Sequence, residues 1–143
     1  MPRADFYLID KPRFREQPLL LVCELAKRGY AANLSILVLA RDAAQAEAID
    51  DLMWSFDPDE YLPHQIAGMD EGDDDTPILI ATPDMDIPAR PMLLNLRDAA
   101  PTGTFERVLE VVPADPSARG PLRERWKHYQ SMGFEVNKHD MQH

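Results

Sequence analysis

The sequence predicts an α/β fold in which a mostly parallel sheet of about five strands carries helices on both faces. Short, continuous apolar runs of the kind found in fully buried strands recur along the chain. Stretches with apolar residues at three- and four-residue steps, typical of helices, lie between several of these runs. No linker is long enough to divide the chain. We therefore expect a single domain, residues 1–143.

The N-terminal half supplies two of the strands and two of the helices. Residues 6–9 form a short apolar run after a polar start and predict the first strand. Residues 18–27 predict a mostly buried helix, with Gly29 placed to end it. The apolar run 35–39 predicts a central strand, and the spacing within 42–56 predicts an amphipathic helix.

The C-terminal half supplies three more strands and a third helix. The apolar runs 78–81 and 92–96 predict two strands joined by a proline-rich turn, and 105–112 predicts a fifth strand. A last helix is expected from 121 to 132, closing at Gly133.

Composition limits the possible functions. The 143 residues are 45% hydrophobic and carry a net charge of −10, which disfavours unaided binding to a polyphosphate backbone. No run is long enough to span a membrane, and no signal peptide is evident. The single cysteine, Cys23, excludes an internal disulfide and suits a reducing cytoplasm. These features favour protein partners and a cytoplasmic location.

The residue patterns of common catalytic and cofactor sites are missing. No two glycines have the spacing of a dinucleotide- or phosphate-binding loop. His139 and His143 are expected in a solvated tail rather than a metal site, and Cys23 in the core. The acidic residues of 70–75 lack the order of a calcium loop and predict a solvated segment whose role is open. We expect no catalytic residues, metal or cofactor.

The segment from Ser117 to Lys138 is basic within this acidic protein. Five cations stand there against two carboxylates, a net charge of +3. The cations are Arg119, Arg123, Arg125, Lys127 and Lys138, and the aromatic residues among them are Trp126, Tyr129 and Phe134.

In a helix, four-residue spacing places Arg119, Arg123 and Lys127 on one face, with Trp126 beside it. Arginine can hold a carboxylate with two hydrogen bonds while an aromatic wall holds an apolar side chain. This face therefore predicts a receptor for an acidic peptide with a free carboxylate. The alternative is an ordinary solvated amphipathic helix. The Gly120-Pro121 pair also leaves open that Arg119 lies just before the helix.

A second cluster follows the helix 42–56. Trp54 lies partly off the buried face, and Tyr61 falls in the next loop beside Pro63 and His64. Exposed aromatic residues at a helix end are candidate interface anchors. The alternative is that Trp54 and Tyr61 only cover the edge of the core.

These segments, in this order, resemble the chi subunits of bacterial DNA polymerase III. The similarity extends over nearly the whole chain. It is carried by Phe6-Tyr7-Leu8-Ile9-Asp10, Val22-Cys23-Glu24-Leu25-Ala26, Trp54, Pro63-His64, Ile66-Ala67-Gly68, Arg123-Glu124-Arg125-Trp126-Lys127, Tyr129, Gly133-Phe134 and Asn137.

The resemblance implies a five-stranded Rossmann-like domain without nucleotide chemistry and with two binding surfaces. One surface holds the psi subunit of the clamp loader, for which a helicase can compete, and its aromatic pair falls on Trp54 and Tyr61. The other holds the acidic C-terminal tail of single-stranded-DNA-binding protein, and its cations fall on Arg119 and Arg123. Trp126 stands where the family has a tyrosine, and Arg119 where a lysine is familiar.

We therefore predict a non-enzymatic adaptor of the DNA polymerase III holoenzyme that acts in DNA replication. Its tail site would comprise Arg119, Arg123, Trp126 and Lys127. Its psi or helicase site would comprise Trp54, Tyr61, Pro63 and His64. The rival functions are a small nucleotide-dependent enzyme on the same fold and a direct binder of single-stranded DNA.

Overall fold

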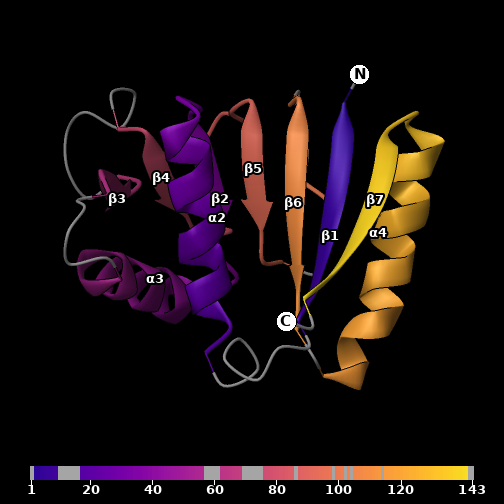
Figure 1. The fold of residues 1–143 in the computed structure, drawn as a ribbon, viewed down its shortest axis with the longest axis horizontal. Coiled ribbons are helices and arrows are strands. Elements are labelled where there is room, and N and C mark those ends of the chain that lie inside the picture. The colour runs from indigo at the N-terminus through magenta and orange to yellow at the C-terminus, as the bar shows by residue number, and fades with distance from the viewer. Residues whose placement is uncertain are drawn as a thin grey trace.

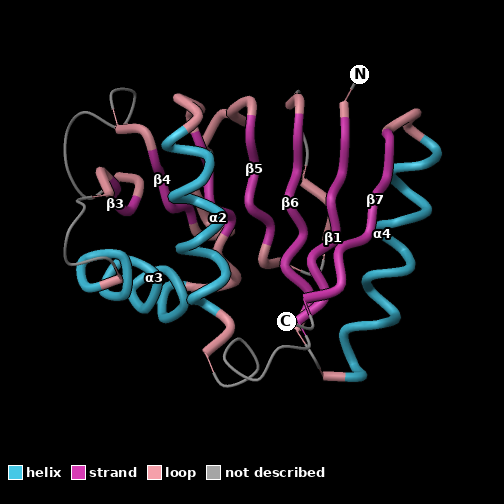
Figure 2. Tube along the Cα trace, in the orientation of Figure 1, coloured by secondary structure: helices cyan, strands magenta, loops and turns pink. Residues whose placement is uncertain are grey.

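The computed structural model describes residues 2–9, 17–56, 62–68, 76–85, 87–97, 99–101, 103, 105–113 and 115–141, with the backbone alone for 140 and 141. Within them, seven strands form one sheet flanked by helices (Figures 1 and 2). The elements are β1 (Arg3–Ile9), α2 (Leu19–Ala31), β2 (Ile36–Leu39), α3 (Ala43–Ser55), β3 (His64–Ile66), β4 (Ile78–Ala81), β5 (Met92–Asn95), β6 (Arg107–Val112), the 3₁₀ turn η2 (Pro116–Ala118), α4 (Arg119–Ser131) and β7 (Glu135–Met141).

The strands are ordered β3-β4-β2-β5-β6-β1-β7, and every neighbouring pair is parallel. The five expected strands are present, and β3 and β7 are two more. Both additional strands are at the sheet edges. β3 has only three residues, and β7 mixes Val136 with polar side chains, because an edge strand needs less apolar surface. Neither therefore contains the continuous apolar run that marks the buried strands.

One face of the sheet is covered by α2 and α3. Alternate residues of the central strands, such as Ile36 and Val38 of β2, point into this layer, since side chains alternate along a strand. α2 contributes Leu21, Val22 and Leu25, and α3 contributes its buried stripe of Ala46, Ile49 and Met53. Asp42 caps α3 by accepting a 2.7 Å hydrogen bond from the Gln45 N–H.

We expected Gly29 to end the helix predicted for residues 18–27. This is wrong, because α2 continues to Ala31 and the chain turns at Asn33, which has a φ of 61°. Gly29 is needed instead for close packing. A Cβ there would lie 2.6 Å from Cδ1 of Ile36 and 3.0 Å from Sδ of Met92. Glycine allows the last turn of α2 to approach the sheet at this point.

We expect Gly29→Ala to destabilise the protein by about 1 kcal/mol, because overpacking outweighs the gain in helix propensity. Urea unfolding measures this change. Ile36→Val removes the atom that the new methyl group would meet, so the double variant should lose less stability than the two single changes summed. Strict additivity would contradict the proposed contact.

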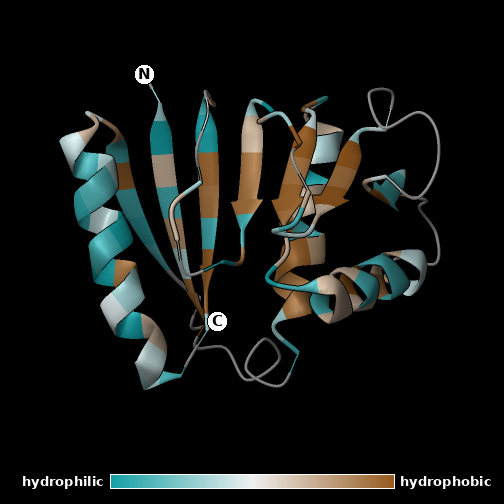
Figure 3. Cartoon of the chain, turned by 180° about the vertical axis from the view of Figure 1, so that it is seen from behind, coloured by the Kyte–Doolittle hydropathy of each residue, from teal (hydrophilic) through white to brown (hydrophobic). Residues whose placement is uncertain are grey.

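The opposite face is covered by α4 at one end and, at the other, by the described parts of the connection from β4 to β5, residues 82–85 and 87–91. Phe6, Val108 and Tyr129 belong to the core under α4, while Met85, Ile87 and Ala89 pack against the same apolar layer further along the sheet. Figure 3 shows the central strands largely brown and α4 largely teal, so α4 presents much polar surface to solvent. Helices on both faces confirm the predicted fold class.

A charged cluster occupies the outer strands on the face that carries α2. The fully buried carboxylate of Asp5 accepts hydrogen bonds from Arg3, from Arg107 and, at 3.0 Å, from His139. Burial opposes ionisation, but these three partners together lower the pKa of Asp5. His139 also stacks on Tyr7 at 4.6 Å between ring centroids. It is therefore part of a strand and not of a solvated tail, as the sequence had led us to expect; His143 lies outside the described residues.

Candidate functional site

The basic segment folds as η2 followed directly by α4. Asp115 precedes η2 and accepts a 2.9 Å hydrogen bond from the Ser117 N–H. α4 begins at Arg119, so the possibility that Arg119 lies before the helix is wrong. Pro121 is tolerated because it lies in the first turn, and Gly120 before it has no Cβ to clash with the proline ring. The helix ends at Ser131, and Gly133, with a φ of 82°, turns the chain just beyond it, as predicted.

The inner face of α4 is anchored to the sheet by a buried polar network. The carboxylate of Glu110, on β6, is fully buried. It accepts hydrogen bonds from Nε of Arg125 at 3.0 Å and from the Tyr129 hydroxyl at 2.5 Å. Nδ2 of Asn95, on β5, donates to the same carboxylate at 2.9 Å. Arg125 therefore holds the helix in place and is removed from the exposed cationic surface that the sequence predicts.

The protonation states of Glu110 and Tyr129 bear on how α4 is held against the sheet. Burial raises the pKa of Glu110, and Arg125, Asn95 and Tyr129 oppose that rise. Burial and the nearby carboxylate raise the pKa of Tyr129 well above its usual range, so its hydroxyl remains a donor. Each buried polar side-chain atom of the described residues has a hydrogen-bond partner. The network is thus complete, which favours one fixed position for the helix.

The outer face of α4 presents Arg119, Arg123 and Lys127 to solvent. Among the residues that the structure describes, none of these three forms an ion pair. Like charges four residues apart disfavour a helix slightly, and the first turn holds no acidic residue to balance Arg119. Stability alone therefore does not account for this row of cations.

Trp126 borders the cationic row. Its ring packs on Phe6 with 5.1 Å between centroids, and the side chain is half-buried. This contact fixes the indole while leaving part of it accessible. Arg123, which is exposed, precedes Trp126 by three residues on α4, so the two side chains leave neighbouring positions of the helix surface. We call the face formed by Arg119, Arg123, Trp126 and Lys127 the basic face.

The second predicted surface centres on Trp54, which is 58% exposed at the end of α3. Its ring meets that of His64 edge-on at 4.9 Å. The sequence predicts a loop at His64, but the structure places it in β3. Its side chain is buried and contacts the Leu62 carbonyl and Asp50. Pro63 is half-buried, and Tyr61 lies outside the described residues. Within the described part of this surface, Trp54 is exposed and its ring lies against the buried ring of His64. We call it the Trp54 surface.

The described residues offer no cluster of histidine, cysteine or acidic side chains able to hold a metal ion. Cys23 is fully buried in α2, in agreement with its predicted core position. Burial, together with Glu24, raises the pKa of its thiol to about 12, so it is a poor nucleophile. No helix in the described ranges is both long and apolar enough to cross a membrane.

Sequence reasoning missed the residues that hold α4 in place. Glu110 interrupts an apolar strand run, RVLEVV, and Asn95 ends another. A carboxylate in a strand that is otherwise buried is a signal, because such a group needs a buried cationic or hydrogen-bonding partner. The sequence does not reveal that the partner is Arg125 rather than Arg123.

Comparison with known proteins supports the expected family. The model of the family described as DNA polymerase III chi subunit, HolC, matches residues 1–137. The chain belongs to this chi subunit family. The chi subunit of Escherichia coli is 33% identical over 147 aligned positions, covering 96% of this chain and 97% of the relative. The chi subunit of Pseudomonas aeruginosa is 29% identical, covering 97% and 96%, and that of Haemophilus influenzae is 28% identical, covering 82% and 83%.

Membership of the chi family assigns the chain to DNA replication as a subunit of DNA polymerase III. The relatives carry the name of the chi subunit of DNA polymerase III. The prediction that the chain is not itself an enzyme is therefore confirmed by its relatives.

Proposed function

We propose that this chi-family protein is an adaptor with two separate docking surfaces. The basic face of α4 binds the acidic C-terminal tail of single-stranded-DNA-binding protein. The Trp54 surface binds the psi subunit, which links chi to the clamp loader, or a helicase that competes with psi. The observation that carries the proposal is the exposed row of cations on α4, which forms no ion pair within the described part of the chain, beside a half-exposed indole.

The chemistry of the basic face suits an acidic peptide terminus. Arg123 can bind a carboxylate through two parallel hydrogen bonds, and Trp126 offers an apolar wall one helical turn away. Arg119 and Lys127 extend the positive charge along the helix to meet further acidic residues. The net charge of −10 over the whole protein repels longer polyanions, which favours a short acidic segment.

The positions of the two surfaces support simultaneous binding of two partners. Trp54 contacts His64 of β3, one edge strand, whereas α4 packs beside β7, the other edge strand (Figure 1). Six inter-strand steps separate these edges, and at about 4.8 Å per step the span is about 29 Å. A tail on the basic face therefore leaves the Trp54 surface open.

A weak tail contact is sufficient for such an adaptor. Many tails lie along one strand of coated DNA, so a released tail is replaced by another at high local concentration. The psi contact adds a second attachment. The assembly can thus hold the polymerase near the template while single contacts exchange.

Calorimetry with a synthetic acidic peptide ending in Pro-Phe tests the tail contact. We expect binding by the peptide with a free carboxylate and much weaker binding by the amidated peptide, because Arg123 needs an anionic partner. Raising NaCl from about 50 to about 300 mM should lower the affinity for the peptide with the free carboxylate by about fivefold or more, since salt screens exposed charges. Equal affinity at both salt concentrations, or for both peptides, would contradict the proposed site.

Direct binding of single-stranded DNA is the second candidate, and the same row of cations is what favours it. A mobility-shift assay with a bare oligonucleotide at moderate salt separates the two functions. We expect no shift under conditions that saturate the acidic peptide. A shift that Arg123→Ala removes would instead assign the basic face to nucleic acid.

A further inference from the structure

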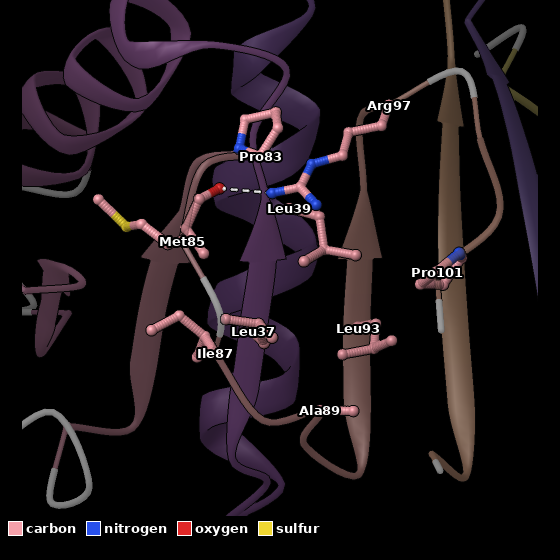
Figure 4. Close-up of a pocket in the computed structure, with 10 residues that line it drawn as sticks. Leu37, Leu39, Pro83, Met85, Ile87, Ala89, Leu93, Arg97 and Pro101 are labelled. Atoms are coloured by element: carbon pink, nitrogen blue, oxygen red, sulfur yellow. Dashed lines mark hydrogen bonds between the residues drawn. The ribbon is translucent and has the colours of Figure 1, made fainter. Parts of the chain in front are cut away.

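The pocket under the connection from β4 to β5 offers an apolar partner no surface. Its floor includes Leu37 and Leu93, which are 2% and 1% exposed because Met85 and Ile87 pack over the central strands there (Figure 4). Arg97, which also lines the pocket, donates hydrogen bonds to backbone carbonyls at the ends of β2 and β4. This pocket therefore belongs to the core on this face of the sheet.

Accessible aromatic surface is found instead at the end of α3. The large apolar side chains that are exposed among the described residues are Tyr30, Trp54 and Met132, and Trp54 is the most exposed of the three. Trp54 lies in the last turn of α3. Asp51 precedes it by three residues, and Glu47 precedes Asp51 by four, so both carboxylates leave the helix surface near the indole. Both are exposed.

The stability of α3 does not account for these two carboxylates. Glu47 and Asp51 repel each other weakly at a spacing of four residues, and negative charge toward the C-terminal end of a helix opposes its macrodipole. The last turn of α3 carries no basic residue. Within the described part of the chain, neither carboxylate forms an ion pair. The end of α3 thus carries uncompensated negative charge beside Trp54.

The third carboxylate of α3 has a partner inside the protein. Oδ1 of Asp50 lies 3.2 Å from Nε2 of His64, whose side chain is buried and whose ring meets Trp54 edge-on. Asp50 is therefore held toward β3. Asp51 and Glu47 remain the carboxylates of α3 that an incoming partner can meet.

The sequence around this surface is unusually one-sided in charge. From Asp42 to Ala89 it contains fourteen of the 25 acidic residues of the chain and neither lysine nor arginine. The exposed row of cations lies on α4, beside the other edge of the sheet. A negative region of this kind attracts basic segments and repels nucleic acids and anionic membranes. The charge complementary to the Trp54 surface is therefore positive.

We propose that the Trp54 surface docks a basic segment of a partner protein, in which an arginine stacks on Trp54 and pairs with Asp51. A guanidinium suits both contacts, because its plane stacks on an indole and its fork matches a carboxylate. The same cation compensates the negative end of α3. The inference rests on the proposed docking role of the Trp54 surface and adds the chemistry of the partner: psi, or the helicase that competes with it, presents the basic segment.

Fluorescence of Trp54 tests the inference without psi. Trp126→Phe leaves Trp54 as the single tryptophan, because the chain has two. The probe is a short helical peptide with arginine at every fourth position, and its matched control carries citrulline, which has a similar shape but no charge. We expect the arginine peptide to change the Trp54 emission in a saturable way. The citrulline peptide should bind at least about tenfold more weakly, since it lacks the charge that Trp54 and Asp51 meet.

Paired substitutions locate the charge that matters. Glu47→Gln combined with Asp51→Asn keeps the side-chain shapes and should lower the affinity for the arginine peptide by about fivefold or more. Glu106→Gln combined with Glu124→Gln removes the same charge from two other exposed positions and should leave the affinity unchanged. Equal binding of the two peptides, or an equal effect of the two pairs of substitutions, would overturn the inference.

Psi binding separates this inference from the proposed function. If Trp54→Ala abolishes psi binding but Glu47→Gln with Asp51→Asn leaves it unchanged, the surface docks psi without selecting a basic segment and only the inference fails. If the arginine peptide binds as expected but Trp54→Ala leaves psi binding unchanged, the psi contact fails and the inference stands. Self-association that Arg123→Ala removes would overturn the inference by assigning the Trp54 surface to the basic face of a second copy.

Discussion

Replacing Glu110 with alanine is expected to lower the free energy of unfolding by about 3–5 kcal/mol, the usual cost of removing one partner of a buried ion pair. The change leaves the buried guanidinium of Arg125 and the hydroxyl of Tyr129 without their common acceptor. For a chain of this length the midpoint of thermal unfolding should fall by about 10 °C or more. Urea unfolding followed by circular dichroism measures the loss.

Matched variants separate the network from a general effect of charge. Glu124→Ala removes a carboxylate from the exposed side of the same helix and should change stability by no more than about 0.5 kcal/mol. Adding Arg125→Ala to Glu110→Ala should recover part of the loss, because the unpaired buried charge is then removed. If Glu110→Ala cost no more than Glu124→Ala, the network would not anchor α4.

The same network should govern tail binding in proteins that remain folded. Glu110→Gln keeps the shape of the side chain but weakens its hold on Arg125. At a temperature where this variant is folded, we expect weaker binding of the acidic peptide and unchanged binding of psi. A loss of both would indicate a wider structural change.

Arg123→Ala should abolish detectable tail binding and leave psi binding intact, and Trp54→Ala should do the reverse. A charge-assisted hydrogen bond contributes about 1.5–3 kcal/mol, which is about ten- to 150-fold in affinity and enough to hide a weak complex. An exposed tryptophan at the centre of an interface contributes about 2 kcal/mol or more. Both side chains reach solvent, so both variants should fold.

The control for Arg123→Ala is Arg28→Ala, which removes one exposed cation from α2 and changes the net charge equally. It should leave both contacts unchanged if the position of the charge, and not the total, matters. Calorimetry with the acidic peptide and pull-down with psi give the two measurements. Equal impairment of both contacts by Arg123→Ala or by Trp54→Ala, in folded protein, would contradict two separate surfaces.

Much of the fold could be predicted because its signals are local. The run at β2 and the spacing of Ala46, Ile49 and Met53 each identify their element within a few residues. The row of cations follows from four-residue spacing, which places Arg119, Arg123 and Lys127 together in any helix that contains all three. β3 and β7 were missed because a short or half-polar edge strand carries no such signal.

The residues alone determined the α/β class, the concentration of positive charge near the C-terminus and the exposed row of cations, since these depend on periodicity over a few turns or strands. Only the tertiary structure decided that Arg125 turns inward to Glu110, that Gly29 lies against Ile36, and that α4 and Trp54 stand at opposite edges of the sheet. These arrangements depend on which strands become neighbours. That choice is made by burying distant segments against one another, so no short stretch of sequence contains it.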